Sequence, residues 1–508
     1  MIGQDLKKLL LVVLCLNISL LYLYFPTDTS TFLREYVVLA PAYEDSPFSH
    51  WEESQPWKTY LDSLNLNKDH QNILNDPDYC QKVKEYQGAT KLSFDSRGLP
   101  LKKSKVVYSD YSPGLLVKKI LKNYTTPVLL NHFGGMSKGK TPYDNLPQSV
   151  NMFFELQPSW HIYHQIGVNF LCEGQIYNHI PGNSWLNYKD VTANTMREYS
   201  KYYVGREHCF DPWKVMPYSL DLTIESDCEE FTRELEENLN SKEIKWMTKK
   251  SRFSHNGQGV FVVDQKKAKE LLKNKCPWEE KWQAQRYIPN PMLIMNRKFD
   301  FRAYMFIASM DPLVILYHDG FVKISLVEYE AESSDLASHL TNTKIAEKSL
   351  KNKNITSEET KALLEDQSWS FEHFESHMLN QNLISENWMD NTLRKHIKKV
   401  MFHLVRMNLD KLLRHPRVFE LFGLDFLIDT DLNIWYIETN LTPSIGSTSE
   451  EKKKVNTKLV TDIIDLEYSL LYGADFDSLL ENTNFEWVFD GRKVGVQRYH
   501  GLLEEDCV

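Results

Sequence analysis

Hydrophobic and polar residues alternate most regularly along residues 421–440, and this pattern predicts two antiparallel strands joined by a short turn. The predicted buried face comprises Leu424, Phe426, Ile428, Trp435 and Ile437. A four-residue loop would pair Asp429 with Ile434, and this register sets Asp425 directly opposite Glu438.

Two acidic side chains therefore face each other in the predicted ribbon. Directly opposed side chains lie about 4.5–5.5 Å apart at Cβ, where like charges are destabilising unless something neutralises them. Asn440 falls on the same strand face as Glu438 and adds a neutral oxygen. Asp425, Glu438 and Asn440 thus predict an all-oxygen site for Mg²⁺ or Mn²⁺. The alternative is that they form only the solvated face of a hairpin.

A second strand pair is predicted at 244–249 and 260–263. The loop between these strands contains Gly257 and Gly259, which allow backbone amides to approach an anion closely. Lys249 ends the first strand with a charge that suits a phosphate. Most Gly-x-Gly loops are simple hairpin turns, and the chain has neither a Walker nor a Rossmann glycine motif here.

The predicted strand at 296–307 has one charged face and one apolar face. The charged face carries Lys298, Asp300, Arg302 and Tyr304, and the apolar face carries Phe299, Phe301, Ala303 and Met305. This pattern is typical of a working surface above a core, although exposed cross-strand salt bridges would produce the same spacing.

Turn signals and helical spacing define the remaining elements. Asp311-Pro312 and Asp319-Gly320 are predicted turns that lead to a strand at 321–325. Helices are expected at 227–239, capped by Asp227, at 357–366 and at 386–414. Basic runs that include Lys452, Lys453 and Lys454 are candidate anion-binding patches, although such runs are usually solvated faces.

The apolar run at 9–25 is long enough for a short transmembrane helix and follows Lys7 and Lys8. No small-residue cleavage pattern follows it, so we expect a type II signal anchor with the catalytic part in the lumen. A cleaved signal peptide, a buried N-terminal helix and a cytosolic orientation are the alternatives.

The seven cysteines have no Cys-x-x-Cys spacing, so a zinc site is not expected. An oxidising compartment would allow some of them to pair, without the sequence fixing the connectivity. Sequons at Asn123 and Asn354 fit a lumenal domain. A third sequon, at Asn440, would place a glycan on the proposed metal ligand, so either this residue escapes modification or the domain faces the cytosol.

The composition of the 508 residues is that of a globular protein, with 42% hydrophobic and 25% charged residues. The formal net charge of −10 argues against general nucleic-acid binding. No function is assigned to residues 26–170.

Taken in order, these motifs resemble the tubulin–tyrosine ligase-like family of ATP-grasp ligases over about residues 175–450. The matching segments are Asn178-His-Ile-Pro-Gly182, Lys189-Asp190, Trp246-Met-Thr-Lys249, His339-Leu-Thr341-Asn342, the segment from Lys298 to Arg302, and the Asp425…Glu438-x-Asn440 ribbon. The resemblance implies an α/β (α+β) chain with an ATP-grasp fold, preceded here by a small α/β domain and the N-terminal transmembrane helix.

The resemblance also implies roles for individual residues. Lys189 and Lys249 would hold nucleotide phosphates, Gln285, Tyr287 and Ile288 would line the adenine, and Asp425, Glu438 and Asn440 would bind Mg²⁺. Lys298, Asp300, Arg302, Lys323, Thr341 and Asn342 would border the phosphates and the acceptor, with Arg302, Lys323 and Glu438 as the catalytic set and Gly257 and Gly259 in the flap.

The implied reaction forms an acyl phosphate from a carboxylate and ATP, and an amine then attacks it to give an amide. Such chemistry demands positioning and charge neutralisation more than covalent help, and closure of the glycine loop would exclude water. Two departures are notable: Lys250 stands where the family usually has proline, and Lys323 stands where an arginine is expected, which removes bidentate geometry.

We therefore expect an ATP-dependent, glutamylase-type amino-acid ligase that acts on a protein acceptor, with tubulin as one candidate. The alternatives are a lumenal glycosyltransferase that uses Asp429-Thr-Asp431, and a non-catalytic nucleotide-binding scaffold. The expected parts of the chain are a tail (1–8), the anchor (9–25), a stem (26–120), a small α/β domain (121–226), a central subdomain with the glycine flap (227–290), a C-terminal subdomain (291–470) and a tail (471–508).

Overall fold

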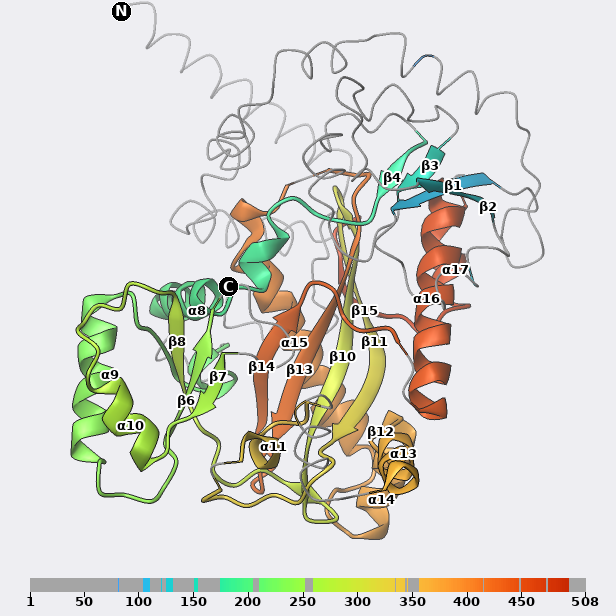
Figure 1. The fold of residues 1–508 in the computed structure, drawn as a ribbon. Coiled ribbons are helices and arrows are strands. Elements are labelled where there is room, and N and C mark those ends of the chain that lie inside the picture. Colours follow the sequence, from blue (N-terminus) through green and yellow to red (C-terminus); the bar gives the residue numbers. More distant parts are fainter. Residues whose placement is uncertain are drawn as a thin grey trace, which may run out of the picture.

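The computed structural model describes most of the chain from residue 174 onward (Figure 1). The described residues are 81, 104–109, 120, 125–130, 150–153, 174–203, 210–251, 259–333, 335–342, 345, 356–413, 415–446, 449–471 and 474–492. The predicted anchor at 9–25 lies outside them. Within these ranges, no helix has the length and apolar character needed to cross a membrane.

A long antiparallel sheet forms the centre of the molecule, with strand order β12-β11-β10-β13-β14. Its strands are β10 (Arg297–Met310), β11 (Leu313–Ile324), β12 (Ser368–Trp369), β13 (Glu420–Ile428) and β14 (Ile434–Asn440). Two short strands extend it: β9 (Leu293–Ile294) pairs with β10, and β15 (Glu486–Asp490) pairs with β11.

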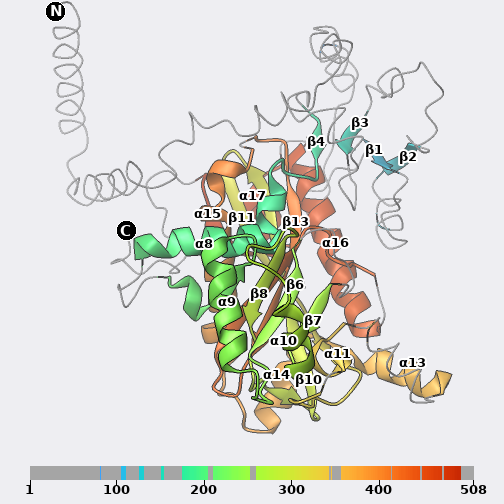
Figure 2. The ribbon, with the colours of Figure 1, turned by 60° about the vertical axis from the view of Figure 1, so that its left-hand side comes forward.

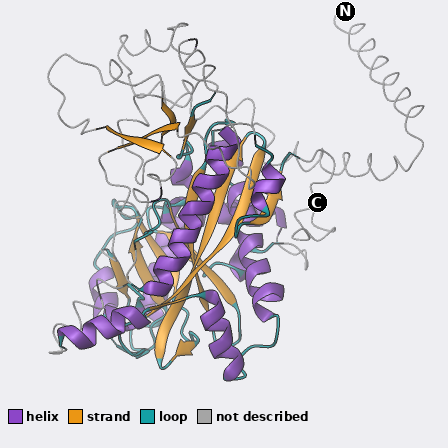
Figure 3. Ribbon diagram, turned by 90° about the vertical axis from the view of Figure 1, so that its right-hand side faces the viewer, coloured by secondary structure: helices purple, strands orange, loops and turns teal. Residues whose placement is uncertain are grey.

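Helices cover both faces of this central sheet, and each face has its own apolar cluster. One cluster includes residues of α8 (Lys189–Tyr203), α14 (Phe371–Asn380), the π-helical turn Met389–Arg394 and α15 (Lys395–Arg406). The other includes residues of α16 (Glu450–Leu471) and α17 (Phe476–Leu480). The long α16 crosses in front of the sheet in Figure 3.

A smaller antiparallel sheet, in the order β5-β8-β6-β7, packs beside the central one and lies in front of it in Figure 2. Its strands are β5 (Ser219–Asp221), β6 (Trp246–Lys250), β7 (Val260–Val262) and β8 (Trp282–Arg286), and it carries α9 (Glu225–Glu237) and α10 (Gln265–Leu271). We call this unit the clasp. A disulfide between Cys228 and Cys276 joins α9 to the segment between α10 and β8.

A parallel sheet in the order β2-β1-β3-β4 lies at one end of the central sheet (Figure 1). It consists of β1 (Ser104–Ser109), β2 (Thr125–Leu130), β3 (Val150–Phe153) and β4 (Ile176–Tyr177). The remaining elements are α11 (Leu336–His339), α13 (Ser357–Asp366) and the 3-10 turns Asn183–Leu186, Pro212–Lys214 and Leu409–Lys411. The mixed α/β architecture expected from the sequence is therefore confirmed.

The register of the β13–β14 ribbon confirms one prediction and corrects another. Asp425 pairs with Glu438 as expected, but Ile428 rather than Asp429 pairs with Ile434. The turn is one residue tighter because the backbone N–H of Asp429 donates to the Asn433 carbonyl at 3.1 Å, with Leu432 in a left-handed conformation, φ 64°. A bulge at Ile437 restores the register before the acidic pair is reached.

The predicted burial of Trp435 and Ile437 is wrong for the same reason. The tighter turn moves the apolar face of β14 by one residue, so that Ile434 and Tyr436 are buried instead. Tyr436 packs edge-to-face on Phe426, with ring centroids 5.8 Å apart.

The two turns predicted around β11 have different outcomes. Asp311-Pro312 does join β10 to β11, whereas Asp319-Gly320 is not a turn but a bulge inside the continuous β11. Two residues of β11 oppose one of β10 there, between the pairs Arg302–Phe321 and Tyr304–His318. The bulge aligns Phe321 with Arg302.

Two predicted helices also differ in their ends. The helix expected from Asp227 begins earlier, at Glu225, and the Asp227 carboxylate instead accepts hydrogen bonds from Arg197 and from the backbone of Asp221. The single helix expected at 386–414 is divided into the π-helical turn, α15 and a 3-10 turn. The helix predicted at 357–366 is confirmed as α13.

Gly320 is expected to be essential for the position of Arg302. A Cβ at this glycine would lie 2.0 Å from the Arg302 carbonyl oxygen, so Gly320→Ala should push the two strands apart and lower the free energy of unfolding by about 1–3 kcal/mol. Urea unfolding monitored by circular dichroism measures this. Gly446→Ala is the control, because its nearest contact is 3.8 Å away; equal stability of the two variants would contradict the assignment.

Candidate active site

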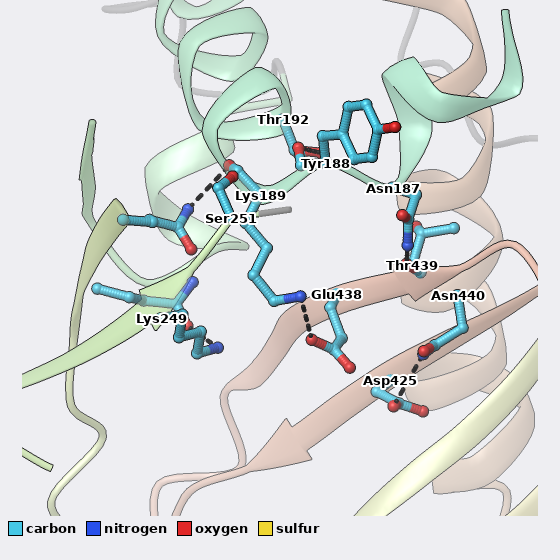
Figure 4. A network of polar contacts seen from close by, with 12 residues as sticks. Asn187, Tyr188, Lys189, Thr192, Lys249, Ser251, Asp425, Glu438, Thr439 and Asn440 are labelled. Atoms are coloured by element: carbon cyan, nitrogen blue, oxygen red, sulfur yellow. Dashed lines mark hydrogen bonds and ion pairs between the residues drawn. The ribbon is translucent and has the colours of Figure 1, made fainter. Parts of the chain in front are cut away.

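Two lysines approach Glu438 from the side of the clasp (Figure 4). Lys189, at the start of α8, places its Nζ 3.3 Å from Glu438 Oε2. The start of α8 is held against the clasp because the backbone N–H of Asp190 donates to Ser251 Oγ at 2.6 Å and Gln283 donates to the Lys189 carbonyl at 3.1 Å. Lys189 is therefore fixed by both the clasp and the central sheet.

Lys249 projects from β6 and is buried. Its Nζ donates to Gln285 Oε1 at 2.6 Å, and Gln285 in turn donates to Ser219 Oγ at 3.2 Å. Burial lowers the pKa of Lys249 to about 8, with Lys189 adding repulsion, while the carboxylates of Glu438 and Asp425 oppose the shift. The ammonium has no carboxylate in direct contact among the described residues.

Asp425 lies at the centre of the site and is neutralised from two strands. Arg302 binds it bidentately, with Nε–Oδ1 2.5 Å and Nη2–Oδ2 3.0 Å, and Lys323 Nζ lies 3.2 Å from Oδ2. Asn440 donates to the same oxygen at 3.3 Å. Burial raises the pKa of Asp425, but Arg302 and Lys323 outweigh it and bring the pKa to about 2.

Asp300 is a second, half-buried carboxylate beside Lys323. Lys323 Nζ lies 2.8 Å from Asp300 Oδ1, and the Thr341 hydroxyl donates to Oδ2. Burial raises the pKa of Asp300, and Lys323 opposes this. Lys323 therefore bridges Asp300 and Asp425, a role that its single ammonium group can fill without the planar fork of arginine.

Glu438 is the more open of the two facing acids, with a side chain 29% exposed. Burial raises its pKa, but Lys189 and Lys249 outweigh this and hold the pKa below its usual value. Its Oε1 makes no hydrogen bond or ion pair with the described residues.

The residues predicted to line the adenine lie on and directly after β8 of the clasp. Tyr287 is buried and its hydroxyl contacts His339 Nδ1 at 2.7 Å, while the Lys298 ammonium lies 4.9 Å from the centre of its ring. Burial lowers the pKa of Lys298 to about 8. Within the described part of the chain, neither backbone polar group of Ile288 makes a hydrogen bond.

The remaining predicted site residues are placed less directly. Gly259 has φ +73°, and a Cβ there would lie 2.8 Å from that of Lys250, so glycine is required. Gly257 lies outside the described residues. Asn342 accepts a hydrogen bond from the backbone of Ile345 at 3.3 Å. Its contact with a nucleotide stays a prediction.

The donor set fits a magnesium ion. Asp425 and Glu438 are adjacent across the ribbon, and Glu438 has a free oxygen. Asn440 turns its amide nitrogen toward Asp425, so this side chain would have to rotate to present its oxygen and complete an all-oxygen set. Among the described residues there is no group of three or more His, Cys, Asp or Glu side chains that could hold a metal. The candidate site thus has two carboxylates and one amide, and it stays a prediction.

The charge of this site is unbalanced. Its cations are Lys189, Lys249, Lys298, Arg302 and Lys323, and its carboxylates are Asp300, Asp425 and Glu438. Charges removed from water are costly unless they are compensated, so an excess of buried and half-buried cations favours an anionic ligand. A polyphosphate with a bound divalent ion meets this requirement.

Two residues that organise the site were missed from the sequence. Ser251, whose hydroxyl also donates to Asp190, and Gln283 hold the start of α8 in place. Gln283 lies two residues before Gln285 on β8, so strand periodicity places both on one face and offers a signal for it.

Comparison with known proteins agrees with this geometry. The sequence profile of the tubulin-tyrosine ligase family matches residues 170–473, which include every described residue of the site. The chain therefore belongs to the tubulin–tyrosine ligase family, within the ATP-grasp superfamily, and the resemblance seen in its motifs is confirmed.

Individual relatives carry different names. The chain is 30% identical over 240 residues to human "Inactive polyglycylase TTLL10" and to rat "Protein polyglycylase TTLL10", covering 44% of this chain and 34% of each relative. It is 25% identical over 382 residues to human "Probable tubulin polyglutamylase TTLL2", covering 72% of this chain and 59% of the relative. The chain thus matches about a third of the length of the TTLL10 proteins.

Lys249 and its neighbour provide a matched test of phosphate binding. Lys249→Met removes a buried cation that faces the site and should weaken ATP binding at least tenfold, because a desolvated charge contact to phosphate is lost. Lys250→Met removes a cation that pairs with Glu280 near the surface and should change it less than twofold. Isothermal titration of ATP measures both; equal effects would exclude Lys249 from the phosphate site.

Proposed function

We propose that this protein is an ATP-dependent ligase that joins an amino acid to a protein acceptor through an acyl phosphate. The observation that carries the proposal is the pair of facing carboxylates, Asp425 and Glu438, bordered by Lys189 and Lys249 on one side and by Arg302 and Lys323 on the other. Family membership supports the same reaction class.

Each group has a defined task in this reaction. Lys189 and Lys249 would bind the phosphates of ATP at the β14 side of the site. Asp425, Glu438 and Asn440 would hold Mg²⁺, which supplies neutralisation of the phosphate charge. Arg302 and Lys323, which both contact Asp425, would orient the reacting carboxylate and stabilise the charge on the transferred phosphoryl group.

The proposed reaction has two chemical steps. An oxygen of the acceptor or amino-acid carboxylate attacks the γ-phosphorus, the bond to the bridging oxygen breaks, and ADP leaves. The amine of the second substrate then attacks the acyl carbon, inorganic phosphate leaves, and the amine loses a proton. The acyl phosphate is easily hydrolysed, so the glycine loop that ends at Gly259 would exclude water.

The amino acid and the acceptor are finer parts of the proposal. We propose glutamate as the transferred amino acid, as the name of the TTLL2 relative suggests. Glycine is the alternative, because the rat TTLL10 relative is named a polyglycylase. Tubulin is a candidate acceptor because relatives with matching sequence are named for it.

We also propose that the domain lies on the lumenal side of a membrane, anchored by residues 9–25. The Cys228–Cys276 disulfide supports an oxidising compartment, because disulfides rarely persist in the cytosol. A lumenal location would separate the enzyme from cytosolic tubulin and would require a different protein acceptor.

The glycosyltransferase alternative loses its main support. The Asp429 carboxylate accepts hydrogen bonds from the backbone of Asp431 and Asn433 and from the side chains of Asn433 and Trp435. These contacts stabilise the turn of the ribbon and leave Asp429 no role in a nucleotide-sugar site. A scaffold without catalysis remains the competing function, and it has a named precedent in the inactive human relative.

Glu438→Gln distinguishes a ligase from a scaffold. This change keeps the shape of the side chain but removes the charge of one metal ligand, so ADP release that depends on an amino acid and an acceptor should fall at least a hundredfold. Coupled ADP release measures this, with circular dichroism to verify folding. Asp431→Asn, in the exposed turn, is the control and should keep full activity; undiminished turnover in Glu438→Gln would refute the metal role.

The proposed compartment is tested on intact vesicles. If the domain is lumenal, added protease should leave it intact until detergent is supplied, and mass spectrometry after thiol blocking should recover Cys228 linked to Cys276. Digestion without detergent, with both cysteines recovered as blocked thiols, would place the domain in the cytosol and restore tubulin as an accessible acceptor.

A further inference from the structure

Lys452, in the first turn of α16, is a buried cation with no role in the reaction proposed above. Its side chain is 9% exposed and makes no hydrogen bond or ion pair with the described residues. Its Nζ lies 4.7 Å from the centre of the Phe321 ring. The next residue, Lys453, is exposed and pairs with Glu450 instead.

The position of Lys452 follows from the register of the central sheet. Glu438, Asp425, Arg302 and Phe321 are direct neighbours across β14, β13, β10 and β11, and so form one row perpendicular to the strands. Strands lie about 4.8 Å apart, so the row is about 14 Å long. Lys189 lies at the Glu438 end of this row, and Lys452 lies at the Phe321 end.

Arg302 and Lys323 share this end of the row with Lys452. Lys323 follows Phe321 by two residues and therefore projects from the same face of β11. The charges of Arg302 and Lys323 are matched by Asp300 and Asp425, whereas the charge of Lys452 is not. Burial, with repulsion from Arg302 and Lys323, lowers the pKa of Lys452 to about 8.

Polar contacts fix the helix that carries Lys452. One turn further along α16, Asn456 accepts a hydrogen bond from the Tyr304 hydroxyl at 2.8 Å and donates to the Gly446 carbonyl at 3.2 Å. The adjacent acid Glu451 is engaged elsewhere, with the Ser370 backbone and with His373. Lys452 is thus held in place beside Phe321 without a nearby carboxylate of its own.

We propose that Lys452, together with Arg302 and Lys323, binds a substrate carboxylate at the Phe321 end of the row. This inference rests on the proposed ligase function and names a specificity residue for it. A buried ammonium without a counter-ion is costly, and a carboxylate from the ligand would remove that cost on binding. The carboxylate comes either from the free amino acid or from an acidic side chain of the acceptor.

The row separates the two charged ends of the reaction. Phosphates would bind Lys189 and Lys249 at the β14 end of the row, where the proposed metal ligands also lie. The carboxylate would bind Lys452 at the β11 end. Since Lys452 is not among the phosphate-binding residues, its removal should affect a carboxylate substrate and spare ATP.

The experiment compares Lys452→Met with Lys453→Met in the full-length protein. ADP release is measured while free glutamate, free glycine or a synthetic glutamate-rich peptide is varied at saturating ATP. Lys452→Met should raise the KM of one carboxylate substrate at least tenfold. Its KM for ATP, measured with ATP varied and the other substrates saturating, should stay within twofold of the wild-type value. Lys453→Met should change neither, and Lys452→Arg should restore part of the loss. The substrate whose KM changes identifies the source of the carboxylate.

The other outcomes separate this inference from the proposed function. If Lys452→Met lowers only the melting temperature and leaves every KM within twofold, Lys452 is a packing residue and the inference is overturned. If the wild-type protein shows no turnover, the proposed function fails. Calorimetric binding of the glutamate-rich peptide and of free glutamate then decides, because equal binding by wild type and Lys452→Met overturns the carboxylate site and weaker binding by the variant supports it.

Discussion

The bidentate contact between Arg302 and Asp425 holds the whole site together. It joins the neighbouring strands β10 and β13. Lys323 of β11 and Asn440 of β14 also contact Asp425, so four strands meet at this carboxylate. Removing one partner of a buried ion pair typically costs about 3–5 kcal/mol, because the other charge is left without compensation. The position of every functional side chain on the central sheet therefore depends on this one carboxylate being ionised and paired.

This constraint also explains how a single sheet presents groups of opposite charge in an ordered row. Backbone register sets Glu438, Asp425 and Arg302 side by side, and the bulge at Asp319-Gly320 then brings Phe321 into line with them. Without the bulge, β11 would present the opposite face at this point, since one residue of slip inverts a strand. The bulge in β11 therefore aligns residues of four strands at the proposed reaction site.

Sequence alone predicted the pairing of Asp425 with Glu438, although its reasoning about the turn was wrong. The predicted four-residue loop and the observed tighter turn with a bulge at Ile437 give the same pairing, because the two differences cancel. Trp435 and Asp319-Gly320 were misjudged because left-handed residues and bulges change the face of a strand without a clear signal in composition. Lys452 appeared only as part of a basic run, since its lack of a partner arises from tertiary packing.

Several cations of the site contact carboxylates of the protein itself, and the same cations are proposed to contact the bound nucleotide. Lys189 contacts Glu438, and Arg302 and Lys323 contact Asp425. Phosphates and a divalent ion would compete for these same groups, so binding would exchange partners rather than create new buried charges. Because Lys189 and Lys249 belong to segments held by the clasp, while Glu438 and Asp425 belong to the central sheet, a nucleotide that contacts both sets would also connect the two units. Charge balance and closure of the site are therefore expected to be one event, which is what a reaction through a water-sensitive acyl phosphate requires.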